Sequence, residues 1–328
     1  MNRFSCNNQC LKVLAHIVLI LSLSVIKLAY AYTGVTILMV SQTPANLEFV
    51  ENFKNELANS KNNGLRVSVL VLQETDKLTI AENSELVIAL GVTALETASN
   101  LKVTTPVLGV FTPLPVFNQI LAKSRRELGN MSAILLDQPY WRQLALIKAV
   151  LPETKKVGIL FGPASSQYLE KLREDADELG LSLMDESVSQ ESELIPKLKK
   201  LLDSSDAMLA IPDRLIYSRE TAEAILLTSY RHQKPMFGYS QSYVRAGALA
   251  SVYSSTKQIA KQAAEIAIKS QAALSQLPLP QIPKYFSVTV NQQVAHALNI
   301  VLTDEGAIYK KMLANESTEV TENEEKKH

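Results

Sequence analysis

The chain of 328 residues has little of the chemistry that catalysis and metal binding require. It contains only two cysteines, Cys6 and Cys10, one tryptophan and four histidines that stand in no metal-ligand spacing: His16, His232, His296 and His328. It also lacks the G-x-S-x-G nucleophile motif, the phosphate-binding P-loop and the glycine fingerprint of dinucleotide sites. We therefore expect no catalytic residue, no metal and no cofactor. An exported hydrolase is the least favoured class, because no histidine is placed as a base for a nucleophile.

The chain also lacks an excess of charge of either sign. The chain has 33 basic and 33 acidic residues and no cluster of Lys and Arg, so nucleic acid is not an expected partner. An apolar content of 47% with 20% charged residues is typical of a globular protein, and the length is sufficient for two α/β domains. Acidic pairs such as Asp175 and Asp177 are expected on solvated helix faces.

The N-terminus has the features of a targeting signal. Arg3 and Lys12 provide positive charge, residues 13–26 form an apolar core, and Ala29-Tyr30-Ala31 is an A-x-A cleavage site. The core is short for a membrane span, so residues 1–31 are predicted to be a cleaved signal peptide, with an uncleaved anchor as the alternative. Cleavage would remove both cysteines and leave a protein without disulfides in the periplasm.

Short apolar runs then alternate with helical periodicity, a pattern typical of parallel sheets covered on both faces. A first set of strands is predicted at residues 34–40, 65–72, 86–90, 106–111 and 131–136. Between them we expect a helix with Phe49, Val50, Phe53 and Leu57 on one face and a short helix that Thr93 begins.

A second set repeats this architecture. Its strands are predicted at residues 156–161, 181–188, 206–211 and 235–239, with helices at 140–151, 165–179, 191–202 and 218–232. Residues 239–243 are interpreted as a polar loop, followed by a small-residue strand around 247–251 and a long helix from about 257. A strand at 284–290 and helices at 291–298 and 304–313 complete the fold, and residues 314–328 are predicted to be a disordered tail.

The ends of the predicted strands are rich in hydroxyl and amide groups. In open parallel sheets ligands meet the carboxyl ends of strands, where such groups and helix N-termini hold small polar or anionic molecules. The candidate ligand-binding residues are therefore those at these ends: Ser41, Gln42, Gly91, Thr93, Ala94, Thr112, Ser165, Ser166, Gln167, Asp213, Arg214, Ser240 and Gln241. For Thr93, Ser165 and Ser166 taken singly, helix capping is the favoured alternative.

Two further groups stand near the same ends. Asp137 and Asp213 are the nearest acids, with local capping and ligand contact as equal alternatives on position alone. If Asp213 contacts the ligand, its replacement by Ala should leave the stability of the ligand-free protein unchanged. Tyr239 and Tyr243 are candidates for a stacking surface, whereas Trp141 is expected to pack in the ordinary way.

The chain resembles the extracytoplasmic substrate-binding proteins of ABC transporters, in the branch often associated with tryptophan or tyrosine. The resemblance runs from about residue 86 to 313. It rests on residues 88–94 (IALGVTA), 128–132 (LGNMS), 143–158 (QLALIKAVLPETKKVG), 243–251 (YVRAGALAS), 259–264 (IAKQAA) and Val290-Asn291. The family's usual Thr-Asp-Pro loop lacks its acid here, at Thr112-Pro113, so amino-acid specificity does not carry over.

The resemblance implies an α/β fold with two Rossmann-like lobes, parallel sheets and a multi-crossing hinge, the type 1 periplasmic-binding fold. We expect lobe 1 at residues 32–137 and 255–282, lobe 2 at 138–254, and a hinge-return strand and helices at 283–313. The expected function is capture of a small polar ligand, such as an amino acid, by a monomer that delivers it to an inner-membrane ABC permease. The alternative is a periplasmic sensor that passes closure to a membrane kinase or receptor.

Overall fold

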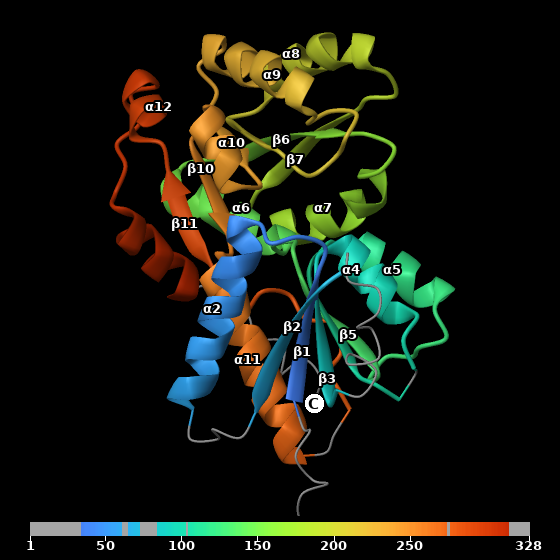
Figure 1. Cartoon of the computed structure of the whole chain (residues 1–328). Helices are drawn as coiled ribbons and strands as arrows, with labels where there is room; N and C mark the ends of the chain where they lie inside the picture. Colours follow the sequence, from blue (N-terminus) through green and yellow to red (C-terminus); the bar gives the residue numbers. More distant parts are fainter. Residues whose placement is uncertain (1–33, 61–64, 73–83, 103, 274–275, 315–328) are drawn as a thin grey trace, which may run out of the picture. The chain divides into compact units, whose positions relative to one another are not determined.

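The computed structural model describes residues 34–60, 65–72, 84–102, 104–273 and 276–314 (Figure 1). The predicted signal peptide, and all but the first residue of the predicted tail, lie outside these residues. The chain divides into two compact units. Unit 1 comprises Met1–Ile134 and Ala260–Gln281, and unit 2 comprises Leu135–Ile259 and Ile282–His328.

Unit 1 is built on a five-stranded sheet in the order β2-β1-β3-β4-β5. β1 pairs in parallel with β2 and β3, and β3 pairs in parallel with β4. The elements of this unit are β1 (Gly34–Met39), α2 (Pro44–Asn59), β2 (Arg66–Val71), β3 (Leu86–Leu90), α4 (Val92–Ser99), β4 (Val107–Thr112), α5 (Leu114–Lys123), β5 (Met131–Leu135) and most of α11 (Thr256–Ala273).

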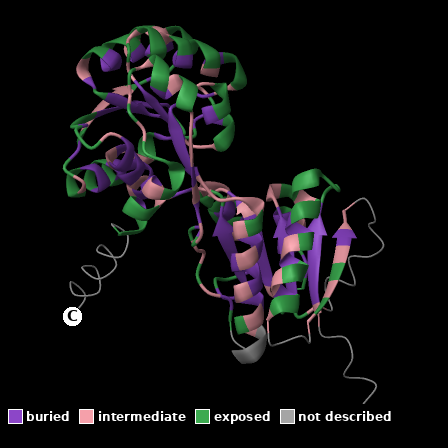
Figure 2. Cartoon of the chain, turned by 90° about the vertical axis from the view of Figure 1, so that its left-hand side faces the viewer, coloured by how far each residue is buried: buried purple, intermediate pink, exposed green. Residues whose placement is uncertain are grey.

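The apolar runs explain this sheet. Every residue of β3 and β5 is buried, as expected for strands covered on both faces, whereas β2 has a single buried residue, Leu70. Figure 2 shows both kinds of strand, in the buried and in the intermediate colour. Helix α2 buries Phe49, Val50, Phe53 and Leu57, the four residues that its periodicity predicts.

Unit 2 contains a six-stranded sheet in the order β11-β10-β9-β8-β6-β7. Its elements are α6 (Tyr140–Val150), β6 (Lys156–Phe161), α7 (Leu169–Glu178), β7 (Ser182–Ser187), α8 (Leu194–Ser204), β8 (Ala207–Leu209), α9 (Arg219–Arg231), β9 (Met236–Gly238), α10 (Gln241–Ala246), β10 (Ala250–Tyr253), β11 (Ser287–Val290) and α12 (Gln292–Ala297), followed by a helix at 305–314. Only β11 is antiparallel, to β10, among the pairs described.

The second sheet repeats the first. Counted from β7, its order is β7-β6-β8-β9-β10, which matches β2-β1-β3-β4-β5, so the predicted repetition of architecture is confirmed. Strand β6 is buried on both faces, because Val157, Ile159 and Phe161 join one apolar cluster and Leu160 joins another. Residues predicted as the hinge-return segment contribute Phe286, Ile308 and Met312 to the first of these clusters.

Several local predictions are wrong. Helix α10 begins inside the segment interpreted as a polar loop, and Ser240 caps its start by accepting from the Tyr243 N–H at 3.2 Å. Helix α4 begins at Val92 after Gly91, and Thr93 does not cap it. The predicted helix at 165–179 begins with a 3-10 turn, Ser166–Tyr168, before α7.

The sequence analysis also missed one helix and the burial of one acidic residue. Helix α5 was not predicted: Pro113 is its N-cap and Pro115 lies in its first turn, where a helix tolerates proline. Asp175 is buried rather than solvated, and its carboxylate accepts from the ammonium of Lys171 at 2.8 Å.

Candidate functional site

Each sheet has one position where the connections diverge to opposite sides. In the order 2-1-3-4-5 this switch point lies between the first and third strands, which are β1 and β3 in unit 1 and β6 and β8 in unit 2. Ligands of open α/β sheets bind outside the carboxyl ends of strands at such points. The candidate residues are therefore described for each unit at this edge.

In unit 1, residues that are far apart in the sequence lie at the ends of neighbouring strands. Exposed Ser41 and Gln42 follow β1, Gly91 and exposed Thr93 follow β3, and Thr112 is the last residue of β4. Because β1, β3 and β4 are adjacent in the sheet, these residues share one edge. Ala94 and Thr112 are buried, so they support this edge and do not present side chains to solvent.

The backbone at this edge adopts conformations that are uncommon. Gly91 has φ +83° and ψ 175°, a region essentially restricted to glycine, and its N–H donates to the Val110 carbonyl at 2.9 Å. Phe111 has φ +58°, and its ring meets that of Phe49 edge-on at 5.7 Å. Sequence reasoning missed Phe111, because it reads as the end of a buried strand. Strain of this kind clusters at functional sites.

Unit 1 also exposes apolar side chains at the same edge. Val40, which follows β1, is 39% exposed, and Leu114, at the start of α5, is 38% exposed. Both read as parts of apolar runs in the sequence. The described part of this edge thus combines neutral polar groups with apolar surface, and none of its predicted site residues carries a charge.

In unit 2, the switch point is closed by a hydrogen-bonded carboxylate. Oδ2 of Asp213 accepts from the Ser165 hydroxyl at 2.8 Å and from the Ser165 N–H at 3.1 Å, and Oδ1 accepts from the Leu215 N–H at 2.9 Å. Asp213 is 6% exposed. This carboxylate therefore joins the loop after β6 to the loop after β8, which is a structural role.

A glycine makes room for this carboxylate. A Cβ on Gly162 would lie 2.6 Å from both Asp213 oxygens, closer than real contacts allow. The Gly162 N–H also donates to the Ser165 hydroxyl oxygen at 3.0 Å. A glycine directly after an apolar strand is the sequence feature that could have indicated this close approach.

The remaining predicted residues of unit 2 lie around this link. Ser166, Gln167, Arg214 and Gln241 are exposed, and Ser240 is half-buried. They follow β6, β8 and β9, which are adjacent strands of the sheet. The Gln241 amide donates to the Tyr253 hydroxyl at 3.3 Å. Asp137, in the segment after β5, is half-buried.

Three tyrosines pack together beneath this edge. The ring centroids of Tyr217, Tyr239 and Tyr243 are 5.3–6.2 Å apart in tilted and edge-on pairs. Burial raises the pKa of Tyr217 and of Tyr243, and within the described residues neither hydroxyl has a hydrogen-bond partner. Tyr243 is thus a core residue, which contradicts its prediction as a stacking surface, whereas Tyr239 remains half-exposed.

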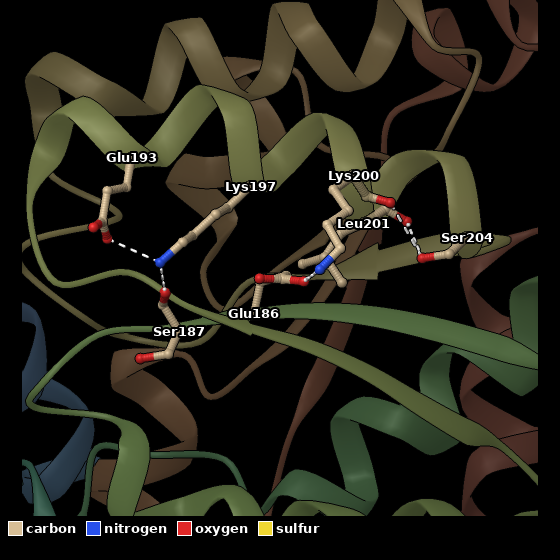
Figure 3. A network of polar contacts seen from close by, with 7 residues as sticks. All are labelled: Glu186, Ser187, Glu193, Lys197, Lys200, Leu201 and Ser204. Atoms are coloured by element: carbon tan, nitrogen blue, oxygen red, sulfur yellow. Dashed lines mark hydrogen bonds and ion pairs between the residues drawn. The ribbon is translucent and has the colours of Figure 1, made fainter.

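Other surfaces of unit 2 are engaged in local pairing. Lys197 pairs with Glu193 at 2.9 Å and Lys200 pairs with Glu186, which ties α8 to β7 (Figure 3). Across the described ranges, no group of three or more His, Cys, Asp or Glu side chains could hold a metal ion. Over the same ranges no helix is long and apolar enough to cross a membrane.

The comparisons with known proteins agree with this arrangement. Residues 45–311 match the family model described as ABC transporter substrate binding protein. The chain therefore belongs to the ABC transporter substrate-binding proteins, a family without enzymatic activity, as the sequence predicted. A tyrosine-binding protein of Clostridioides difficile (strain R20291) is 19% identical over 255 residues, which cover 76% of this chain and 72% of that protein.

Solved structures share the fold at low identity. A ligand-free, open substrate-binding protein with adhesive properties from Clostridium difficile has a TM-score of 0.67 at 18% identity, over 83% of this chain and 96% of that one. A domain from Streptococcus pneumonia in complex with L-Trp has a TM-score of 0.53 at 16% identity, over 85% and 98%. An arabinose-binding protein from Geobacillus stearothermophilus has a TM-score of 0.51 at 12% identity, over 80% and 98%. The predicted type 1 periplasmic-binding fold is thereby confirmed.

Proposed function

We propose that this substrate-binding protein captures a small polar ligand between its two lobes, in the periplasm, and delivers it as a monomer to an inner-membrane ABC permease. One observation carries the proposal. In each unit, exposed neutral polar side chains lie just after the carboxyl ends of strands beside the switch point. A ligand that touches both edges would stabilise a closed form by contacts that the open form lacks.

The site residues take two roles in this proposal. Ser41, Gln42, Thr93, Ser166, Gln167, Arg214, Ser240 and Gln241 would contact the ligand, because they are exposed or half-buried. Ser165 and Asp213 would hold the loops in place, since their hydrogen bonds are made to one another. Gly91, with a backbone that only glycine tolerates, would bring its loop close to the ligand.

An amino acid with an aromatic side chain is the ligand class that we favour. The proteins described as tyrosine-binding and as an L-Trp complex are both similar to this chain. Tyr239 adds support from the chain itself, because its half-exposed ring rests on Tyr217 and Tyr243 and offers a firm face for stacking. The exposed guanidinium of Arg214 would pair with the ligand carboxylate.

The test is a thermal-shift panel of amino acids, purines, sugars and inorganic anions on the purified chain, followed by calorimetry of each hit. We expect L-tyrosine or L-tryptophan to raise the Tm, and glycine to do so less. Ser166→Ala should weaken the hit about fivefold, the value of one hydrogen bond of roughly 1 kcal/mol.

Ser204→Ala is the matched control. The Ser204 hydroxyl donates to the nearby carbonyls of Lys200 and Leu201, at 3.3 and 3.2 Å, much as the Ser166 hydroxyl donates to the Pro163 carbonyl (Figure 3). Ser204, however, is the last residue of α8 and precedes β8, so it lies away from the carboxyl ends of the strands. Equal loss of affinity in both variants would contradict the proposed edge. A hit by a sugar with none by amino acids would overturn the ligand class. Cross-linking of the ligand-loaded chain to a kinase in native membranes would contradict delivery to a permease and support the sensor function.

A further inference from the structure

The chain passes between its two units three times: after Ile134, after Ile259 and after Gln281. On the unit 2 side, a hydrogen-bonding group of one network lies within a few residues of each passage. These groups are Gln138 near the first passage, Ser254 near the second and the Pro283 carbonyl near the third.

Arg142 is the centre of this network. Its Nη1 donates to Oε1 of Gln138 at 2.8 Å and to the Pro283 carbonyl at 2.9 Å. The first partner lies 4 residues before it on the entry to α6, and the second lies 141 residues after it. One guanidinium nitrogen thus binds the first and third connecting segments together.

Gln138 extends the network to the second connection. Its amide donates to the Ser254 hydroxyl at 2.8 Å, and that hydroxyl donates to the Tyr285 carbonyl. The Gln138 carbonyl is in turn held by the Gln143 amide at 3.0 Å. All three connections are therefore linked by side chains within unit 2.

The arginine is fixed in a low-dielectric place. Arg142 is 3% exposed, and its guanidinium carbon lies 4.4 Å from the centroid of the Phe286 ring and 5.1 Å from that of Trp141. A planar guanidinium stacked on a ring can donate in its own plane to two acceptors, which a lysine ammonium does not reproduce. The site therefore depends on arginine and not on positive charge alone.

We propose that Arg142 is a positioning residue that fastens the three connections to unit 2 as one block. Bending during ligand capture then falls on the connections beyond this network, at residues 136–137 and 281–282 and along α11 beyond its first turn. The bending rests on the proposed function, whereas the fastening is a property of the ligand-free protein. The two can therefore fail separately.

Hydrogen–deuterium exchange of the ligand-free full chain tests the fastening. In Arg142→Lys we expect amide exchange to rise at least about tenfold near residues 138, 254 and 285 together. In Ser254→Ala the rise should centre on residues 253–256, because the Arg142 bonds to Gln138 and Pro283 remain. A rise confined to α6 in Arg142→Lys would overturn the proposal.

Arg126→Lys is the matched control. Arg126 is 4% exposed in unit 1, and its guanidinium donates to the carbonyls of Ser99, Leu101, Lys102, Thr105 and Asn130. This variant removes a guanidinium that is as buried as that of Arg142, so it also perturbs a buried hydrogen-bonded arginine. Its faster exchange should appear around residues 99–105 and 126–130 and leave the three connections unchanged. A simultaneous rise at the connections in both variants would show global loosening and contradict the role of Arg142.

A second readout follows the bending itself. Trp141, the one tryptophan of the chain, lies beside Arg142 and reports by its fluorescence on this neighbourhood. With L-tryptophan excluded as a probe, L-tyrosine should change Trp141 emission in the wild type and change it less steeply with concentration in Arg142→Lys. Identical titrations, together with altered exchange, would retain the fastening and reject its part in ligand capture.

Discussion

The carboxylate of Asp213 accepts two hydrogen bonds from Ser165, at 2.8 Å from its hydroxyl and 3.1 Å from its N–H, across 48 residues of sequence. This pair sits at the switch point of the second sheet, where β6 and β8 are neighbours. It fixes the two loops that carry Ser166, Gln167 and Arg214. The geometry of the proposed site in unit 2 therefore depends on a contact that no ligand needs to touch.

Asp213→Ala should destabilise the ligand-free protein, contrary to the expectation for a ligand contact. It leaves the Ser165 and Leu215 N–H groups without their acceptor in a buried place, so we expect a loss of about 2–4 kcal/mol in urea unfolding. Asp203→Ala, which removes a carboxylate that is 74% exposed, should cost less than about 0.5 kcal/mol. Unchanged stability in Asp213→Ala would refute the structural role.

Tyr217→Phe and Tyr243→Phe should leave the free energy of unfolding within about 0.5 kcal/mol of the wild type, or raise it. Each removes a buried hydroxyl that has no partner among the described residues, so no hydrogen bond is lost and a desolvation penalty is relieved. Tyr253→Phe, which loses the bond from Gln241, serves for comparison. A loss above about 1 kcal/mol would reveal a bound water at these hydroxyls.

Tyr239→Leu should weaken binding of the aromatic ligand about tenfold and leave the unfolding free energy closer to the wild type than Tyr243→Leu does. The half-exposed ring of Tyr239 is the face proposed for stacking, whereas Tyr243 is 6% exposed and part of the core. Calorimetry with L-tyrosine and chemical unfolding separate the two effects. Equal affinity in wild type and Tyr239→Leu would remove Tyr239 from the site.

Acid sensitivity should depend on Asp206. Burial by itself would raise the pKa of this carboxyl, but the N–H groups of Lys155 and Lys156, at 2.9 and 2.8 Å, and the charge of Lys234 lower it below its usual value. A lowered folded-state pKa stabilises the protein fully above the unfolded pKa of about 4 and loses that contribution as pH falls through the folded pKa.

Asp206→Asn tests this dependence by unfolding at about pH 7 and about pH 3. We expect the variant to be less stable than the wild type near neutrality, with a difference that shrinks in acid. A difference that stays constant or grows in acid would assign the effect to lost geometry and not to charge.

Much of the fold follows from local sequence. The residues 157–161 of β6 are all buried because both faces of the strand are covered, and α2 repeats its buried residues at helical spacing. Helix α10 was missed because six residues are too few for a period to register. Its place is determined by tertiary contacts, such as the Asn291 amide that donates to the Val244 carbonyl at 3.0 Å.

The candidate site was likewise predictable from the sequence only in part. Strand ends indicated which loops gather at the carboxyl edges, since adjacent parallel strands end on one side. They could not indicate which side chains point outward, so Ala94, Thr112 and Asp213 were grouped with exposed residues. The links of Arg142 to segments 141 residues away, and of Asp213 to Ser165, depend on the folded arrangement and leave no local signal.

Native mass spectrometry of the purified full chain, before and after incubation with the panel of amino acids, purines, sugars and anions, would detect capture of a small ligand directly. We expect a one-to-one complex with a single small molecule, of amino-acid mass, that survives gentle transfer and is lost on denaturation. A chain that retains its own mass throughout, under conditions where its fold is intact, would contradict capture of a small ligand.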